Sequence, residues 1–455
     1  MLRRRSHIDM LHGPLLKNIV AYALPIIVTS VLQLLFNTAD LLVVGWYCGS
    51  TSVGAVGSTN ALINLMVNLF MGLSIGVSVT VAQGIGAEDR ERVSKTIHTA
   101  FPVALICGVI ITAVGMAFSP TFLEWMGNPD DTMDLATVYM RWYFCGTIGN
   151  MVYNFGAAIL RAAGDTIRPL MFLSIAGVLN VVLNLIFVCI FQMNVAGVAL
   201  ATAVSQWVSA VLVVLALLKR HDLCRLDPHL LTIDKTAMKR ILAIGVPSGI
   251  QGSLFSISNV IIQSAVNSFE TAAVVGSAAA SNIEGYVYTS QNAFAQTAMN
   301  FTGQNVGAGQ FKRVKKVWRG CLLAVTVVGV ALGGLVNLLG RPLLGIYITD
   351  SPDAIGYGLT KLLWICLPYF VCGLMECTSY TLRGLGKSLF SMIISVVGVC
   401  GFRLMWIFTV FQIPAFHTLD SLFASYVISW TATLLVGICV LLPLLKKLQR
   451  QNGEA

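Results

Sequence analysis

Twelve apolar stretches dominate this sequence of 455 residues and limit what it can fold into. Each is at least as long as the ~20 residues that a helix needs to cross the ~30 Å hydrocarbon core of a bilayer. Only 11% of the residues are charged, whereas soluble domains have about 25%, so we exclude a soluble globular enzyme. We predict an all-α polytopic membrane protein with twelve transmembrane helices. They are expected at 15–46, 53–84, 96–118, 136–160, 168–191, 195–218, 241–268, 272–302, 318–340, 358–382, 388–413 and 420–445.

The basic residues lie almost entirely on one side of these predicted spans. The arginines at positions 3–5 and Lys17 precede the first span, and further clusters follow every second span. Positive residues mark the cytoplasmic side of a membrane protein, so we predict a multi-pass protein of the plasma (inner) membrane with both termini in the cytoplasm. This topology accounts for the net charge of +9, and we expect no nucleic-acid partner. Four basic residues fall elsewhere: Arg141, Arg341, Lys361 and Arg403.

The two halves of the sequence resemble each other at an offset of 222 residues. This offset pairs Pro25 with Pro247 and Arg161 with Arg383. We therefore predict two parallel six-helix lobes, at 15–218 and 241–445, joined by a cytoplasmic linker at 219–240. The sequence has no Walker A pattern for nucleotide binding, so we expect ion-coupled secondary transport rather than transport driven by the chain's own ATP hydrolysis.

Several short segments, in register along nearly the whole chain, resemble the multidrug and toxic compound extrusion (MATE) family, most closely its DinF-type branch. They include Phe36-Asn37-Thr38-Ala39-Asp40, Ala82-Gln83-Gly84-Ile85-Gly86, Leu160-Arg161-Ala162-Ala163-Gly164-Asp165 and Gly303-Gln304-Asn305-Val306-Gly307. The resemblance implies a V-shaped pair of lobes around a central cavity, the MATE/MOP-type fold. It also implies export of amphipathic or cationic organic compounds by antiport with H⁺ or Na⁺, through alternating access. We expect no bound cofactor beyond the coupling ion, and a monomer.

Asp40 is a carboxylate in the outer half of the first predicted span, where a charge costs ~2.5–3.5 kcal/mol and so has a partner or a task. Gln33 and Asn37 share its helical face. The resemblance implies an ion-coupling site in the N-terminal lobe. Its residues would be Asp40, Asn37, Asn154, Asn180, Asn184 and Thr202. Oxygens of Asp40, Asn180 and Asn184 are candidate Na⁺ ligands, while a protonated Asp40 is the alternative. Some DinF-type members have aspartate at position 184, so Asp40 is expected to act as the only acid there.

A second polar group lies in the C-terminal half. Glu284, Tyr288, Asn292 and Gln296 recur every four residues and share one face of the eighth predicted span. They either line a substrate cavity or form hydrogen bonds between helices. Candidate cavity residues are Gln33, Glu284, Tyr288, Asn292, Gln296, Glu376 and Arg403. Glu376 and Arg403 have the alternative of a structural ion pair across the tenth and eleventh spans.

Pro25 removes one backbone hydrogen bond inside the first span and is a candidate hinge. We expect the partners of this chain to be small organic molecules and the bilayer. A flippase for lipid-linked precursors is the nearest alternative function, but it needs several basic residues to hold phosphates. An intramembrane transferase is a more distant alternative, and we expect the chain not to be an enzyme.

Overall fold

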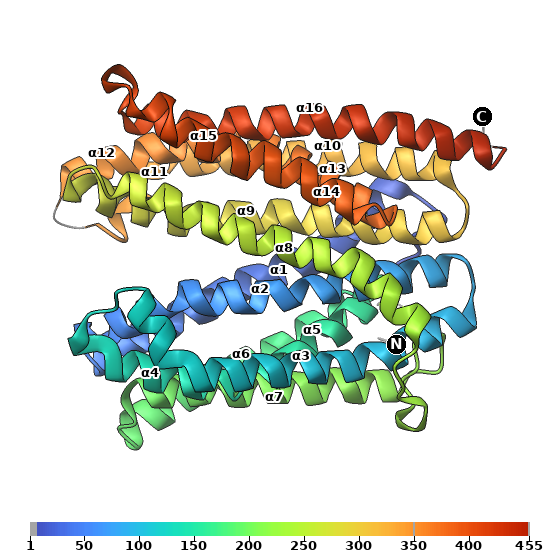
Figure 1. Ribbon diagram of the computed structural model, residues 1–455, viewed down its shortest axis with the longest axis horizontal. Helices are drawn as coiled ribbons and strands as arrows, with labels where there is room; N and C mark the ends of the chain where they lie inside the picture. Colours follow the sequence, from blue (N-terminus) through green and yellow to red (C-terminus); the bar gives the residue numbers. More distant parts are fainter. Residues whose placement is uncertain (1–6, 349–350, 454–455) are drawn as a thin grey trace. The chain divides into compact units, whose positions relative to one another are not determined.

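A computed structural model describes residues 7–348 and 351–453, so the arginines at positions 3–5 lie outside the described residues. The described chain is helical and contains no β-strand (Figure 1). Its α-helices are α1 (Leu15–Tyr47), α2 (Ser50–Gly86), α3 (Arg90–Trp125), α4 (Asp130–Phe144), α5 (Thr147–Ala162), α6 (Ile167–Leu185), α7 (Asn194–Leu218), α8 (Lys235–Val266), α9 (Thr271–Gly307), α10 (Phe311–Leu338), α11 (Gly340–Gly345), α12 (Pro352–Lys361), α13 (Tyr369–Gly384), α14 (Ser388–Ser395), α15 (Phe402–Phe408) and α16 (Leu419–Gln451). Three α-helices continue directly into a π-helical segment. These segments are Ile186–Ile190, Leu362–Cys366 and Val396–Gly401.

Most predicted spans correspond to single long helices. In the described part of the chain, nine helices are long and apolar enough to cross a membrane, and a pair bent by 40°, Pro352–Cys366 with Tyr369–Gly384, makes a tenth. The predicted span at 136–160 is instead divided between α4 and α5. The span at 272–302 lies in α9, whose polar residues at every fourth position lower its hydropathy. The prediction of an all-helical multi-pass protein is therefore confirmed. Of the twelve predicted spans, the one at 358–382 passes only as the bent pair, and those at 136–160 and 272–302 do not pass as apolar helices within the described chain.

The chain forms two compact units. Of the described residues, the first unit contains 7–8 and Val28–Gly249, and the second contains Asp9–Ile27, 250–348 and 351–453. The unit boundaries thus fall inside α1 and α8, and not at the ends of the predicted linker. Each boundary follows the second residue after a proline. In α1 the proline is Pro25, and in α8 it is Pro247. The first part of each proline-containing helix therefore packs with one unit and its remainder with the other.

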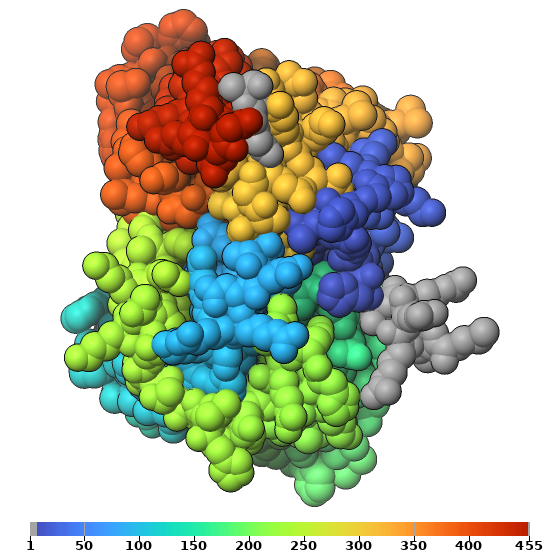
Figure 2. All heavy atoms as spheres, turned by 90° about the vertical axis from the view of Figure 1, so that its right-hand side faces the viewer, coloured from blue at the N-terminus to red at the C-terminus, as the bar shows by residue number. Residues whose placement is uncertain are grey.

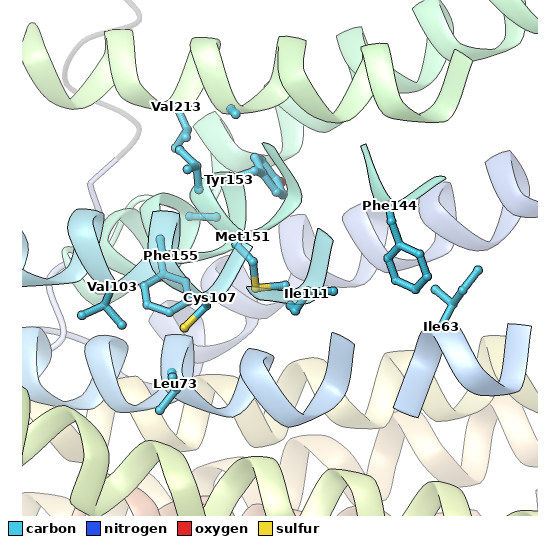
Figure 3. Close-up of a cluster of buried hydrophobic side chains, with 14 of the residues drawn as sticks. Ile63, Leu73, Val103, Cys107, Ile111, Phe144, Met151, Tyr153, Phe155 and Val213 are labelled. Carbon is cyan, nitrogen blue, oxygen red and sulfur yellow. The ribbon is translucent and has the colours of Figure 1, made fainter. Parts of the chain in front are cut away.

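The core of the first unit is built around α5, which contacts α2, α3, α6 and α7. Small residues allow close contact there, since a Cβ on Gly108 of α3 would lie 2.7 Å from the Cα of Ile148. In Figure 3, Cys107 and Ile111 of α3 lie near Met151 and Phe155 of α5, and all four are buried. Burying apolar surface gives about 25 cal/mol per Å² in water, but inside a bilayer such close packing is itself the main attraction.

In the second unit, α9 is the central helix and contacts α10, α12 and α13. Its polar side chains consequently face other helices of the same bundle rather than lipid alone. The first part of α1 belongs to this unit, where Tyr22 meets Phe301 of α9 edge to face with ring centroids 5.4 Å apart. Such aromatic pairs contribute ~0.5–1.5 kcal/mol beyond their area of contact.

The connection between α7 and α8 is attached to the first turns of α3 (Figure 2, yellow-green beside light blue). His98, which is buried, accepts a hydrogen bond from the backbone N–H of Asp227 at 3.0 Å. Thr99 donates to the carbonyl of Thr232 and accepts from the N–H of Asp234. The last residues of the predicted linker at 219–240 belong to α8, which begins at Lys235.

Candidate functional site

Asp40 lies in the part of α1 that belongs to the first unit, and it is partly buried. The amide of Asn184 on α6 donates to its Oδ1, and the hydroxyl of Thr202 on α7 lies 3.5 Å from its Oδ2. Among the described residues, no lysine, arginine or histidine nitrogen comes within 4.0 Å of this carboxylate. Its hydrogen-bond partners are therefore neutral, and none of the residues at 7–348 and 351–453 forms an ion pair with it.

Asn180 completes this group. Its amide donates to the hydroxyl of Thr202 at 3.2 Å, and its Oδ1 accepts from the amide of Asn184 at 3.3 Å. The Oδ1 of Asn184 is buried and has no hydrogen-bond partner among the described residues. Immediately after Asn184, α6 widens into the π-helical segment Ile186–Ile190, a feature frequent at functional sites. Three helices thus bring together four of the predicted ion-coupling residues.

The other residues predicted near Asp40 have no described hydrogen bond to it. Gln33 and Asn37 are exposed on α1, and Asn154 donates to the carbonyl of Asn150 within α5 at 2.8 Å. No described contact joins any of the three to Asp40. Two tyrosines that the sequence analysis did not select, Tyr139 and Tyr143 of α4, stack with ring centroids 6.2 Å apart and lie within electrostatic range of Asp40.

The second unit holds an ion pair that the sequence analysis missed. Lys361 Nζ, at the end of α12, lies 3.6 Å from Glu284 Oε2 on α9 and also donates to the hydroxyl of Ser281. Tyr369 on α13 donates to the other oxygen of Glu284 at 3.1 Å. Lys361 falls inside the predicted span at 358–382, and an unexplained charge in a span was the signal that could have identified it.

The predicted ion pair between Glu376 and Arg403 is wrong. Among the described residues, no basic nitrogen lies within 4.0 Å of the Glu376 carboxylate. Glu376 instead accepts from the Tyr288 hydroxyl at 3.1 Å and from the Asn292 amide at 3.0 Å. Arg403 donates to Ser429 at 3.1 Å, with its guanidinium 3.9 Å from the ring centroid of Tyr426. The aromatic face attracts the cation, and Asn292 and Tyr288 project from α9 toward Glu376, so each charge has other contacts.

A known family matches both halves of this chain. The MatE family model matches residues 25–186 and again 247–409, which are offset by the same 222 residues as the internal repeat. The chain belongs to the MATE family. Its members are multidrug efflux transporters, so this MATE protein is a transporter and not an enzyme.

Relatives of this MATE protein carry names of the same kind. The probable multidrug resistance protein YpnP of Bacillus subtilis is 29% identical over 392 residues, covering 86% of this chain and 87% of that protein. The probable multidrug resistance protein NorM of Thermotoga maritima is 26% identical over 395 residues, covering 85% and 84%.

Two solved structures share the fold. One is a multidrug resistance MATE transporter of the MOP superfamily in an outward-facing conformation, with a TM-score of 0.89, 23% identity and coverage of 98% of this chain and 99% of that one. The other is a MOP superfamily transporter from Pyrococcus furiosus, with a TM-score of 0.91, 22% identity and coverage of 97% and 98%. The predicted MATE/MOP-type fold is therefore confirmed.

Close packing between Gly177 of α6 and Phe36 of α1 holds the Asp40 group together. A Cβ on Gly177 would lie 1.8 Å from the Phe36 ring, one helical turn before Asp40 on α1. We expect Gly177→Ala to push α1 away from α6, at a cost of ~1–3 kcal/mol, and to weaken ion-coupled transport. Adding Phe36→Leu should make room and restore much of the transport rate. A double variant as impaired as Gly177→Ala, when both are measured in vesicles, would contradict this role of the contact.

Proposed function

We propose that this MATE protein exports amphipathic organic cations in exchange for H⁺ or Na⁺, and that Asp40 carries the coupling ion. The observation that supports this most is the chemistry around Asp40. Its carboxylate is held by the Asn184 amide and the Thr202 hydroxyl, with no basic nitrogen within 4.0 Å among the described residues. A carboxylate inside a membrane protein without a counter-ion is stabilised by binding a proton or a metal cation.

Either ion fits the surrounding groups. A proton would neutralise Asp40 directly, after which the carboxyl could donate to a nearby oxygen. Sodium is a hard cation and takes oxygen ligands. The oxygens that would hold it belong to Asp40, Asn180 and Asn184, and the buried Oδ1 of Asn184 lacks a hydrogen-bond partner within the described chain.

The two proline-containing helices support an alternating-access cycle. A proline inside a helix lacks one backbone N–H and weakens the helix locally. The packing of α1 changes from one unit to the other between Ile27 and Val28, and that of α8 changes between Gly249 and Ile250. We propose that Pro25 and Pro247 let each helix bend where it passes from one unit to the other.

The class of substrate and the location follow from the relatives and the charge pattern. Relatives named as multidrug resistance proteins support organic compounds as substrates. We further propose that one chain works alone in the plasma membrane, with both termini in the cytoplasm, as the positive-inside rule predicts. A flippase for lipid-linked precursors has less support, because Glu284 neutralises Lys361. Arg383 and Arg403 then remain as buried cations of the second unit, and each lies over an aromatic ring.

The experiment is transport of ethidium by the purified protein in proteoliposomes with an imposed pH gradient or sodium gradient. We expect uptake against the substrate gradient with one of the two ions and loss of that uptake when its gradient is collapsed. Ethidium transport that is indifferent to both gradients would overturn the proposal. Flipping of a fluorescent lipid-linked pyrophosphate in the same vesicles would instead support the flippase.

A further inference from the structure

A group of basic side chains lies at the surface of the second unit, in the first turns of α10. Lys315, Lys316 and Arg319 share one face of this helix, and each is at least partly exposed. Within the described chain, no carboxylate oxygen lies within 4.0 Å of these three cations. Their charges are therefore available to an anionic partner.

The next turns of the same helical face are apolar and exposed. Leu323 follows Arg319 by four residues, and Val327 and Val330 continue this spacing by four and three. Their exposed fractions are 57%, 60% and 49%. A phospholipid combines the same two properties, because an anionic phosphate is joined to apolar acyl chains. This face of α10 therefore matches such a lipid in both charge and polarity.

The end of α16 lies beside the start of α10 and carries a second basic group. The side-chain amide of Gln449 donates to the backbone carbonyl of Phe311 at 3.3 Å, and Figure 2 shows the red atoms of α16 next to the yellow atoms of α10. Lys446, Lys447 and Arg450 are exposed on this end of α16. For them too, no carboxylate oxygen of the described residues lies within 4.0 Å. Two groups of three cations thus occur where the two helices meet.

The contact between these two helix ends is itself apolar. Val314 and Trp318 of α10 belong to one hydrophobic cluster with Leu441 and Leu445 of α16, and all four are buried. Because apolar side chains fill this contact, the basic side chains beside them are left at the surface of the unit.

The first unit covers the corresponding surface with its own chain. In the internal repeat, α3 corresponds to α10, and the first turns of α3 hold the connection between α7 and α8 through residues such as His98. Lys95 of α3 also has an acid beside it, since its Nζ lies 2.6 Å from Glu91. The basic side chains of α10 have neither kind of contact in the described chain. This difference between the two halves indicates that the basic face of α10 serves a partner from outside the chain.

We propose that the basic ends of α10 and α16 bind an anionic phospholipid, with an acyl chain along the exposed apolar face of α10. Lysine and arginine form charge-assisted hydrogen bonds with phosphate oxygens, and basic residues near a bilayer surface attract anionic lipids. The bound phosphate would lie between cations of both helices and hold their ends together. Binding at this surface involves neither Asp40 nor a coupling ion, so it can be tested independently of transport.

The test is binding of phosphatidylglycerol to the purified protein in detergent, measured by native mass spectrometry at increasing lipid concentration. The variant combines Lys315→Gln, Lys316→Gln and Arg319→Gln. We expect it to bind this lipid about 100-fold more weakly than the unchanged protein, because each basic residue near a lipid surface contributes about fivefold in affinity. The unchanged protein should bind phosphatidylcholine, which has no net charge, far more weakly than phosphatidylglycerol.

The matched control removes three exposed basic residues from the first unit and gives the same net charge. It combines Arg225→Gln, Lys235→Gln and Lys239→Gln. We expect this control to bind phosphatidylglycerol as the unchanged protein does. If the two triple variants lost affinity equally, the lipid would be attracted by the overall positive charge, and the site on α10 would be wrong.

Two further results would overturn the proposal. Equal affinity for phosphatidylcholine and phosphatidylglycerol would show that the cations do not select the lipid. Displacement of phosphatidylglycerol by an equal concentration of inorganic phosphate would show that the acyl chains contribute nothing, and that the surface holds free phosphate instead. Should the variant of α10 not fold, the same loss of affinity is expected when Lys446→Gln, Lys447→Gln and Arg450→Gln are combined in α16, and unchanged affinity would contradict the site.

Discussion

Replacing Asp40 by asparagine is expected to reduce gradient-driven ethidium transport to the level of vesicles without protein. Asparagine is nearly isosteric with aspartate but binds neither a proton nor sodium as a carboxylate does. The amide can still accept from Asn184 and from the Thr202 hydroxyl, so the helices should stay together. The loss of one charge-assisted hydrogen bond changes the free energy of unfolding by ~1–2 kcal/mol at most, partly offset by removal of a buried charge. Transport is measured with imposed pH and sodium gradients, and folding by thermal unfolding in detergent.

The control for this variant is Asp134→Asn, which removes an exposed acid of α4 in the same unit. It should transport like the unchanged protein. Undiminished transport by Asp40→Asn under both gradients would show that the coupling ion binds elsewhere. A variant that fails to fold would be replaced by Asp40→Glu, for which we expect transport at a reduced rate, since the longer acid keeps the charge.

Arg220→Met is expected to destabilise the first unit strongly. Arg220 follows α7, is 6% exposed and donates to Asp222 through two of its nitrogens, while a third nitrogen lies 3.9 Å from Asp165. Methionine keeps an unbranched apolar stem but leaves both acids without this cation. Removing one member of a buried ionic group costs ~3–5 kcal/mol, so the unfolding midpoint in detergent should fall by several degrees. Arg225→Met, at an exposed arginine of the same loop, should change it little.

The difference in unfolding midpoint between the unchanged protein and Arg220→Met should become smaller as the pH falls. Burial alone would raise the pKa of Asp222, but the hydrogen bond and charge of Arg220 hold it below its usual value of about 4. A lowered pKa gives stability that is present above the unfolded pKa and is lost as the pH falls through the folded one. Burial raises the pKa of Asp165, so its ionised form costs stability near neutral pH, and Arg220 reduces that cost. Protonating both acids therefore removes the need for Arg220. If Arg220→Met lowered the unfolding midpoint equally at pH 7 and pH 4, this role of Arg220 beside the two acids would be contradicted.

Much of this molecule could be predicted from local patterns. Long apolar stretches report helices that can cross a bilayer, because length and hydropathy are properties of each segment alone. The duplication, visible in pairs such as Pro25 and Pro247, is likewise present in the sequence and agrees with the two matches to the family model. Asp40 stood out because charges in apolar stretches are rare, and Asn180 and Asn184 because they share one helical face.

The partners of each polar residue required the tertiary structure. Two side chains on different helices meet only if both helices have the right rotation and depth, and periodicity within one helix does not determine either. For this reason Glu376 was matched with Arg403, whereas it bonds to Tyr288 and Asn292. Asn154 was placed beside Asp40 although it bonds to its own helix. Gln33 and Asn37 share the helical face of Asp40 and yet are exposed.

The sequence alone therefore determined that this chain is a duplicated, helical membrane transporter with an acid at position 40 inside its first span. Those properties follow from composition, spacing and internal similarity, which are independent of how the helices pack. Only the tertiary structure decided which buried charges have an oppositely charged side chain beside them. It placed Lys361 beside Glu284, left Asp40 and Glu376 with neutral partners, and changed the packing of α1 and α8 just beyond their prolines. An ion pair requires two side chains, often far apart in the chain, to lie within a few ångströms of each other. The packing of complete helices sets that distance.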